Sequence, residues 1–314
     1  TKAFTLNGIQ FNAARVVGPA IAGVILGIAG ATPLFVFNTV TFLAVLIAVS
    51  RTPDAPPPPQ DGQRAWPQIR DAAAFIFGQK GPFCVFLAMV VMSLFAAPLI
   101  RMLPLYVIDV YRVPVDTGAA DLVTSLLIAV LGVGAVLGGL SLKYVPAWYP
   151  KHHFIPVAIA GAGLTILLFG LTRHLTVGYI AMFFVGLFWI WGFNPAWAAM
   201  QGLVSDQMRG RVMAMANVAA FGVTAIGNIA AGWLGEGVEK LLASGRVATF
   251  EPSVAKEIGT HFAVAGPAAG LLLAGVIMLI WRVPEVDGLK PGHPEYAHRR
   301  NIWDGLTARS HRPR

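Results

Sequence analysis

Residues 16–50 read VVGPAIAGVILGIAGATPLFVFNTVTFLAVLIAVS and carry no charged side chain. These 35 residues are too many for one helix across a bilayer, because a spanning helix needs about 20 mostly apolar residues. The stretch is interrupted at residues 30–33 by GATP, a combination typical of a tight turn. It therefore predicts a hairpin of two transmembrane helices, over residues 8–29 and 32–50.

The remainder of the chain repeats this apolar character. Of the 314 residues, 56% are hydrophobic and only 12% are charged, whereas soluble domains carry about 25% charged residues. So few charges cannot cover a surface of this size in water. The sequence predicts an all-α, polytopic membrane bundle of about eight transmembrane helices. The six further predicted spans cover residues 82–108, 119–142, 154–172, 176–203, 210–235 and 261–282.

A proline-rich segment separates the hairpin from the later spans. Residues 51–68 read RTPDAPPPPQDGQRAWPQ, and four consecutive prolines favour an extended conformation and exclude a helix. Residues 69–80 then predict a short amphipathic helix that leads into the membrane. With the N-terminus placed in the cytoplasm, sixteen lysines and arginines fall on the cytoplasmic side and five on the other. The positive-inside rule therefore predicts that both termini are cytoplasmic.

The composition excludes several classes of function. The net charge of +8 lies in loops and the tail, as expected for a membrane protein, so we do not expect nucleic-acid binding. The single Cys84 cannot form an internal disulfide, and the histidines show no metal-ligand spacing. Adjacent His152 and His153 are predicted to be loop residues near the lipid headgroups. No metalloprotease, Walker A or nucleophile-elbow motif is present, so we expect no enzyme activity and no cofactor.

Polar residues inside the predicted spans are candidates for function, because they are costly at membrane depth. Arg101 lies within the third span beside two prolines, and two interpretations stay open: its side chain reaches outward to the headgroups, or it lines a substrate path. Asn194 and Gln201 are seven residues apart and therefore share a helix face. We predict a substrate cavity formed by Arg101, Asn194, Gln201 and three tryptophans, Trp189, Trp191 and Trp197.

Small residues four apart predict close helix packing, for example Gly134 with Gly138 and Gly266 with Gly270. Acidic residues are absent from the middle of every predicted span. A proton-coupled carrier usually needs a buried carboxylate, so the sequence identifies no coupling residue.

Residues 7–30, NGIQFNAARVVGPAIAGVILGIAG, resemble helix five of major facilitator superfamily transporters. The similarity is greatest to the bacterial branch that includes the enterobactin exporter and the transmembrane secretion effectors. The residues that carry this helix-five motif are Asn12, Arg15, Gly18, Pro19 and Gly23. Residues 35–49 resemble helix six of the same branch.

Residues 205–236 resemble the loop between helices ten and eleven together with helix eleven of that branch. The resemblance implies a cytoplasmic gating loop formed by Asp206, Arg209, Gly210 and Arg211. Two interpretations stay open for Asp206: it pairs with one of these arginines and latches the helices in one state, or it forms an exposed ion pair of little energetic value.

The resemblance also implies a register, in which the eight spans correspond to helices five to twelve of a twelve-helix fold. Helices one to four are then missing, and we expect that this polypeptide alone does not transport. The implied regions are the last two helices of the N-terminal half (1–50), a cytoplasmic linker (51–80), the C-terminal six-helix half (81–284) and a basic cytoplasmic tail (285–314).

The implied function is a secondary-active, proton-coupled exporter of a small amphipathic compound, siderophore or drug-like, that works by alternating access in the bacterial inner membrane. Its implied partners are the substrate, protons and the lipid bilayer. The alternative is a non-transporting membrane scaffold or a degraded transporter fragment. The DNA upstream of Thr1 distinguishes the two: an in-frame region encoding four more apolar spans favours the exporter, and a native start codon beside Thr1 favours the alternative.

Overall fold

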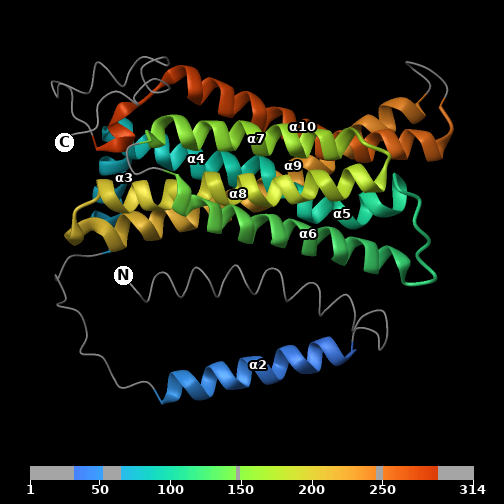
Figure 1. The fold of residues 1–314 in the computed structure, drawn as a ribbon, viewed down its shortest axis with the longest axis horizontal. Helices are drawn as coiled ribbons and strands as arrows, with labels where there is room; N and C mark the ends of the chain where they lie inside the picture. Colours follow the sequence, from blue (N-terminus) through green and yellow to red (C-terminus); the bar gives the residue numbers. More distant parts are fainter. Residues whose placement is uncertain (1–31, 52–64, 146–148, 245–249, 289–314) are drawn as a thin grey trace.

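A computed structural model describes residues 32–51, 65–145, 149–244 and 250–288, and this part of the chain is entirely helical apart from its connections (Figure 1). Seven of its helical stretches are long and apolar enough to cross a membrane. The elements are α2 (Thr32–Ser50), α3 (Ala65–Gly78), α4 (Lys80–Ala96), α5 (Pro98–Asp109), α6 (Ala119–Ser141), η1 (Leu142–Tyr144), α7 (Lys151–Leu171), α8 (Leu175–Leu203), α9 (Asp206–Ala243), α10 (Pro252–Trp281) and η2 (Pro284–Asp287).

The seven stretches confirm the second to eighth predicted spans. The first predicted span, residues 8–29, lies outside the described residues, and so does the helix-five motif formed by Asn12, Arg15, Gly18, Pro19 and Gly23. The predicted amphipathic helix is confirmed as α3, which buries Ala72 and Ile76 and packs against α4 and α9.

Three predicted boundaries are corrected. The third span consists of two helices, because Pro98 has no N–H to continue the hydrogen-bond ladder of α4. The eighth span begins at Pro252 instead of residue 261, since proline is well suited to the first turn of a helix. The predicted gating loop is also helical, because α9 already begins at Asp206. Polar residues that hydropathy assigned to loops therefore lie in the first turns of α9 and α10.

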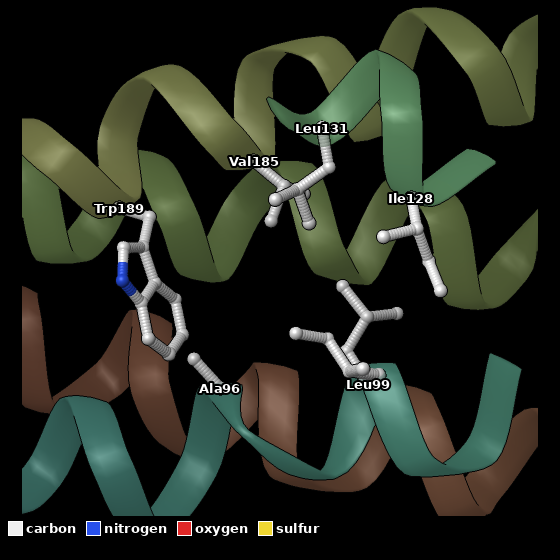
Figure 2. Close-up of a pocket in the computed structure, with 7 residues that line it drawn as sticks. Ala96, Leu99, Ile128, Leu131, Val185 and Trp189 are labelled. Atoms are coloured by element: carbon white, nitrogen blue, oxygen red, sulfur yellow. The ribbon is translucent and has the colours of Figure 1, made fainter. Parts of the chain in front are cut away.

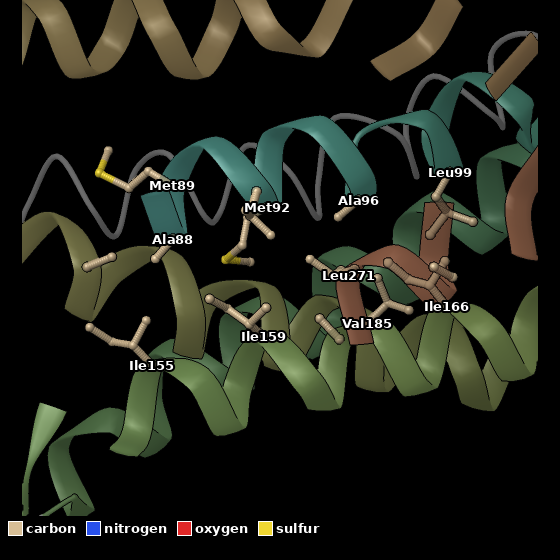
Figure 3. Packing of buried hydrophobic residues seen from close by; sticks show 14 of the residues in the cluster. Ala88, Met89, Met92, Ala96, Leu99, Ile155, Ile159, Ile166, Val185 and Leu271 are labelled. Carbon is tan, nitrogen blue, oxygen red and sulfur yellow. The ribbon is translucent and has the colours of Figure 1, made fainter. Parts of the chain in front are cut away.

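The helices from α4 to α10 form one bundle with a continuous apolar core. In it α7 packs along α10, α6 packs along α8, and α4 contacts both α8 and α9. Figure 3 shows Met92 of α4 pointing toward Ile159 of α7, with Leu271 of α10 nearby, while Met89 points away from Ile159. These four side chains are almost completely buried, at 0–1% exposure. Among the described residues Cys84 is a free, buried thiol, and no cluster of metal-ligating side chains is found.

Glycines allow α6 and α8 to approach closely. A Cβ atom on Gly134 would lie 1.9 Å from the carbonyl oxygen of Phe183, and one on Gly186 would lie 1.9 Å from that of Leu131. No side chain fits in that space, so the predicted small-residue contact at Gly134 is confirmed as a backbone-to-backbone packing site.

Helix α2 differs from the other α-helices because it buries none of its residues. It lies apart from the bundle in Figure 1, and large apolar side chains such as Phe35, Phe42 and Leu46 are more than half exposed. An apolar helix uncovered on every side is typical of a segment whose solvent is lipid.

Candidate functional site

The break between α4 and α5 borders a cavity of about 120 Å³ that lies between these helices and α6 and α8. Its wall is almost wholly apolar, with α4 and α5 on one side and α6 and α8 on the other (Figure 2). The lining residues are Ala96, Leu99, Ile100, Ile128, Leu131, Val185 and Trp189.

An aromatic row runs along α8 from this cavity. The rings of Trp189 and Phe193 are stacked at 6.0 Å with an angle of 7° between their planes, and Phe193 lies 6.2 Å from Trp197. The three residues are four apart and therefore occupy one helix face. All three are half-buried against the core. This row, Trp189–Phe193–Trp197, joins the cavity to the C-terminal part of α8.

Trp191, the third tryptophan of the predicted cavity, lies elsewhere. Its indole N–H points to the carbonyl oxygen of Gly138 at 3.0 Å and to Oγ of Ser141 at 2.9 Å. Its ring lies 5.6 Å from that of Phe154 on α7. Trp191 thus binds α8 to α6 and does not line the cavity.

The polar residues predicted for the cavity lie around it without lining it. Arg101 is exposed on α5, directly after the lining residue Ile100, and makes no hydrogen bond or ion pair within the described residues. Asn194 is exposed and Gln201 is half-buried, both on α8. The structure therefore places Arg101 directly after a lining residue, Gln201 one turn beyond Trp197 on α8, and Asn194 exposed between Phe193 and Trp197.

The residues predicted as a gating loop form the first turns of α9. Arg209 is exposed and its guanidinium lies 3.5 Å from the carbonyl oxygen of Val204, which ends α8. Gly210 has open space around the position of a Cβ atom, and Arg211 is half-buried. The side chain of Asp206 lies outside the described part, so both interpretations of that residue remain open.

A second polar site lies where α5 ends and α10 begins, and the sequence analysis missed it. Glu257 of α10 is only 4% exposed. Its Oε2 accepts a hydrogen bond from Nη2 of Arg112 at 2.9 Å, and its Oε1 accepts one from Nε of Arg173 at 2.8 Å. The α5–α6 and α7–α8 connections are thereby both bound to α10. Arg112 has a φ of +54°, a conformation that costs a non-glycine residue about 1 kcal/mol or more.

A second carboxylate, that of Asp109 at the end of α5, also contacts α10. Its Oδ1 accepts a hydrogen bond from Nζ of Lys256 at 2.8 Å, and its Oδ2 accepts one from Oγ1 of Thr260 at 3.1 Å. The carboxylate side chain is only 7% exposed. The end of α5 is thus bound directly to α10 by a charged group that has little contact with water.

Tyr106 and His261 complete this site. The hydroxyl of Tyr106 lies 2.9 Å from the carbonyl oxygens of both Phe169 and Thr172, at the end of α7. It also lies 3.1 Å from Nδ1 of His261, which in turn is 2.7 Å from the carbonyl oxygen of Gly170. Nε2 of His261 lies 3.9 Å from Glu257. We call the following residues the rim cluster: Tyr106, Asp109, Arg112, Arg173, Lys256, Glu257, Thr260 and His261.

One sequence signal would have revealed the rim cluster. Lys256, Glu257, Thr260 and His261 stand at helical spacing after Pro252, which suits the first turn of a helix. Their polarity instead suggested a loop. Glu257 lies in the second turn of α10, before the start of the predicted span, and the longer helix makes it a buried carboxylate at this end of the bundle.

The opposite end of the bundle is tied by Asp287 of η2. Its Oδ1 accepts a hydrogen bond from the backbone N–H of Lys151 at 2.7 Å, and its Oδ2 contacts Nδ1 of His152. His152 and His153 are both buried in the first turn of α7. Their assignment to a loop is wrong, because α7 already begins at Lys151 and η2 packs against its first turn. Their place near the headgroups stays a prediction.

The comparisons with known proteins agree with this architecture. A family model described as "Transmembrane secretion effector" matches residues 1–298. No curated protein matches. Two crystal structures of a bacterial homolog to the human lysosomal transporter Spinster are similar, both inward-facing. For the unoccupied one the TM-score is 0.56 and the identity 17%, over 77% of this chain and 55% of that chain.

The occupied conformation has a TM-score of 0.55 and 16% identity, over 90% of this chain and 67% of that one. The chain thus spans between about half and two thirds of the length of these solved structures. At this level of identity the similarity concerns the fold, and it confirms the predicted all-helical membrane architecture.

Proposed function

Because the chain belongs to the transmembrane secretion effector family of major facilitator transporters, we propose that it acts in proton-coupled export of a small amphipathic compound. The chain is a multi-pass membrane protein, and its family is one of transporters and not of enzymes, so the predicted superfamily is confirmed. Our proposal beyond the family concerns the class of substrate, the coupling of transport to protons and the direction of transport.

The cavity beside α5 carries this proposal. Its apolar wall and the row Trp189–Phe193–Trp197 offer contacts to the apolar body of a substrate. Arg101, exposed and without a partner in the described part of the chain, adds a positive charge directly after a residue that lines the same cavity. A compound with an apolar body and a polar group suits this combination.

The break between α4 and α5 supports alternating access. Because Pro98 removes a backbone hydrogen bond and Pro104 lies inside α5, this helix is able to tilt relative to α4. One end of α5 borders the cavity and the other belongs to the rim cluster. A tilt of α5 would therefore change access to the cavity.

We further propose the inner membrane of a bacterium as the location, with both termini in the cytoplasm. The rim cluster then faces the exterior and Asp287 the cytoplasm. The proposed regions are those implied by the resemblance: residues 1–50 from the N-terminal half, 51–80 as linker, 81–284 as the C-terminal half and 285–314 as tail.

An efflux assay tests the proposal. Cells that express the complete gene product are loaded with an amphipathic fluorescent dye, and the rate of dye loss is measured with and without a protonophore. We expect export that the protonophore abolishes. Trp189→Leu, Arg101→Ala and Asn194→Ala probe the cavity and its surroundings, and Trp233→Leu, at a residue of α9 that is 73% exposed, serves as the control.

The expected result is a several-fold loss of export in Trp189→Leu and Arg101→Ala, with Trp233→Leu unchanged. Equal export by all variants would contradict the cavity assignment. Export that persists in the presence of protonophore would contradict proton coupling.

A further inference from the structure

We propose that His261 and Glu257 form a proton-binding site, and that a proton bound there holds the end of α5 against α10. This inference rests on the proposed proton-coupled transport, for which it supplies the coupling residue. The proton comes from solvent and is taken up by the imidazole ring, so no other bond is made or broken.

The contacts of His261 determine which nitrogen takes the proton. The carbonyl oxygen of Gly170 only accepts hydrogen bonds, so Nδ1, 2.7 Å away, carries a hydrogen. In the neutral ring Nε2 then has the free electron pair. This atom lies 3.9 Å from Oε1 of Glu257, and the His261 and Glu257 side chains are only 13% and 6% exposed. A proton on Nε2 would therefore stand next to a buried carboxylate.

The same proton would strengthen the contacts that join the helices. A charged imidazolium is a better donor than a neutral ring, so the bond from Nδ1 to Gly170 would tighten. Tyr106 of α5 lies 3.1 Å from the same nitrogen. His261 thus connects α10 with both α7 and α5, and its charge state affects all three helices.

Several other charged and titratable groups face this site. The groups from the packed elements are Tyr106 and Asp109 of α5, Tyr111 and Arg112 after α5, Arg173 after α7, Tyr179 of α8, Glu239 of α9, and Lys256 and Glu257 of α10. The two arginines oppose a further positive charge, and Glu257 favours it. Because the Arg112 and Arg173 side chains are 69% and 64% exposed, water screens their repulsion more than it screens the attraction of Glu257.

Since the attraction of Glu257 is screened less than the repulsion of the two arginines, a proton on His261 is stabilised at this site. Proton binding stabilises the arrangement in which α5 lies against α10, and by reciprocity that arrangement binds the proton more tightly than one in which α5 has moved away. We expect α5 to be held against α10 while His261 carries the proton and to be released when His261 loses it.

A distance measurement tests this without any transport. Cysteines are introduced as Val115→Cys and Ser253→Cys, both at exposed positions, in a Cys84→Ala background, and carry nitroxide labels in lipid nanodiscs. Double electron–electron resonance then gives the distance between them at a series of pH values. We expect a short, narrow distribution at low pH that becomes longer and broader as the pH rises.

The variants make the test specific. His261→Gln keeps a hydrogen-bond donor but removes titration, so the pH dependence should vanish. His174→Gln is the matched control, because His174 is an exposed histidine between α7 and α8 near the same site. Glu257→Gln should give the long, broad distribution at every pH. Where Glu257→Gln does not fold, Arg173→Gln replaces it. This variant removes a positive charge that repels a proton on His261, so the change in distance should occur at a higher pH.

Each outcome of these measurements supports or overturns either the proton-binding site or the proposed function. A distance in the unsubstituted protein that does not depend on pH, or a dependence that persists in His261→Gln or vanishes in His174→Gln, overturns the site. A pH-dependent distance that requires His261, together with no export by the complete gene product in the efflux assay, supports the site and refutes the proposed function. Proton-driven export that persists in His261→Gln leaves the function standing and removes His261 as its coupling residue.

Discussion

The hydroxyl of Tyr106 lies 3.1 Å from Nδ1 of His261, although the two residues are 155 positions apart in the chain. The same hydroxyl lies 2.9 Å from each of two carbonyl oxygens that end α7. Three helices thus meet at one phenol whose residue is completely buried. Because a buried polar group without its partner is costly, this contact requires α5, α7 and α10 to be positioned together.

Replacing Tyr106 with phenylalanine should destabilise the bundle. The substitution removes the single hydroxyl hydrogen that the Phe169 and Thr172 carbonyl oxygens share, and we expect a loss of about 1–3 kcal/mol. The measurement is thermal unfolding of the purified protein in detergent, followed by circular dichroism. An unchanged midpoint would show that this hydrogen bonding contributes nothing to stability.

Tyr111→Phe is the matched control, and it should leave the thermal stability unchanged or raise it. The Tyr111 hydroxyl is buried without a hydrogen-bond partner among the described residues, and burial raises the pKa of its phenol. Removing an unsatisfied polar atom relieves a desolvation cost, so the unfolding midpoint should stay the same or rise. A drop as large as that of Tyr106→Phe would mean that the Tyr111 hydroxyl does have a partner.

Gly134→Ala should separate α6 from α8. The added Cβ atom would lie 1.9 Å from the carbonyl oxygen of Phe183, so the backbones must move, at a cost of about 1–3 kcal/mol. Gly222→Ala in α9 is the control, because no atom lies within 4 Å of that Cβ position and alanine favours a helix. We expect lower thermal stability for the first variant and equal or higher stability for the second. Equal midpoints for both would contradict the close packing of α6 and α8.

Asp287→Asn should release η2 from the start of α7. The amide has only one oxygen, so it cannot replace both carboxylate oxygens that face the Lys151 N–H and Nδ1 of His152, and the protection of this end against hydrogen exchange should fall. Hydrogen exchange of residues 282–288, read by mass spectrometry, should become faster. Lys151→Ala is the control, because only the backbone of that residue is used, and it should exchange as the unsubstituted protein does. Slow exchange in Asp287→Asn would show that the apolar contacts of η2 alone hold it against the start of α7.

Trp191→Phe and Trp189→Leu should separate stability from transport. Trp191 donates to Gly138 and Ser141, so its replacement should lower the unfolding free energy by about 1 kcal/mol and leave export unaffected. Trp189 lines the cavity, so its replacement should reduce export of a dye by the complete gene product. A loss of export in Trp191→Phe without a loss of stability would indicate that Trp191 does line the substrate path.

The spans could be predicted from local composition, whereas the helix ends near Asp206 and Glu257 could not. Residues 119–142 and 176–203 are apolar over the length of a membrane, so their helices need no knowledge of their neighbours. Glu257 is polar in any local window. Only the arginines of two distant connections make its burial possible, and they are 145 and 84 residues earlier in the chain.

The tryptophans of α8 show the same division within one helix. Periodicity places Trp189 and Trp197 with Phe193 on one face, and the stacked rings agree with it. Trp191 is as aromatic and as central in the sequence, but the backbone of α6 accepts its N–H. Which tryptophan borders a cavity depends on where the neighbouring helices lie, and the sequence of α8 does not contain that information.

The sequence by itself therefore determined that this protein crosses a membrane repeatedly, where its proline-rich interruption lies and which small residues sit between helices, because hydropathy and residue size act locally. The tertiary structure alone decided that α5 is bound to α10 through Tyr106, Asp109 and Arg112. Those contacts join residues far apart in the chain, and a buried charge is stable only when the fold brings its partners within hydrogen-bonding distance.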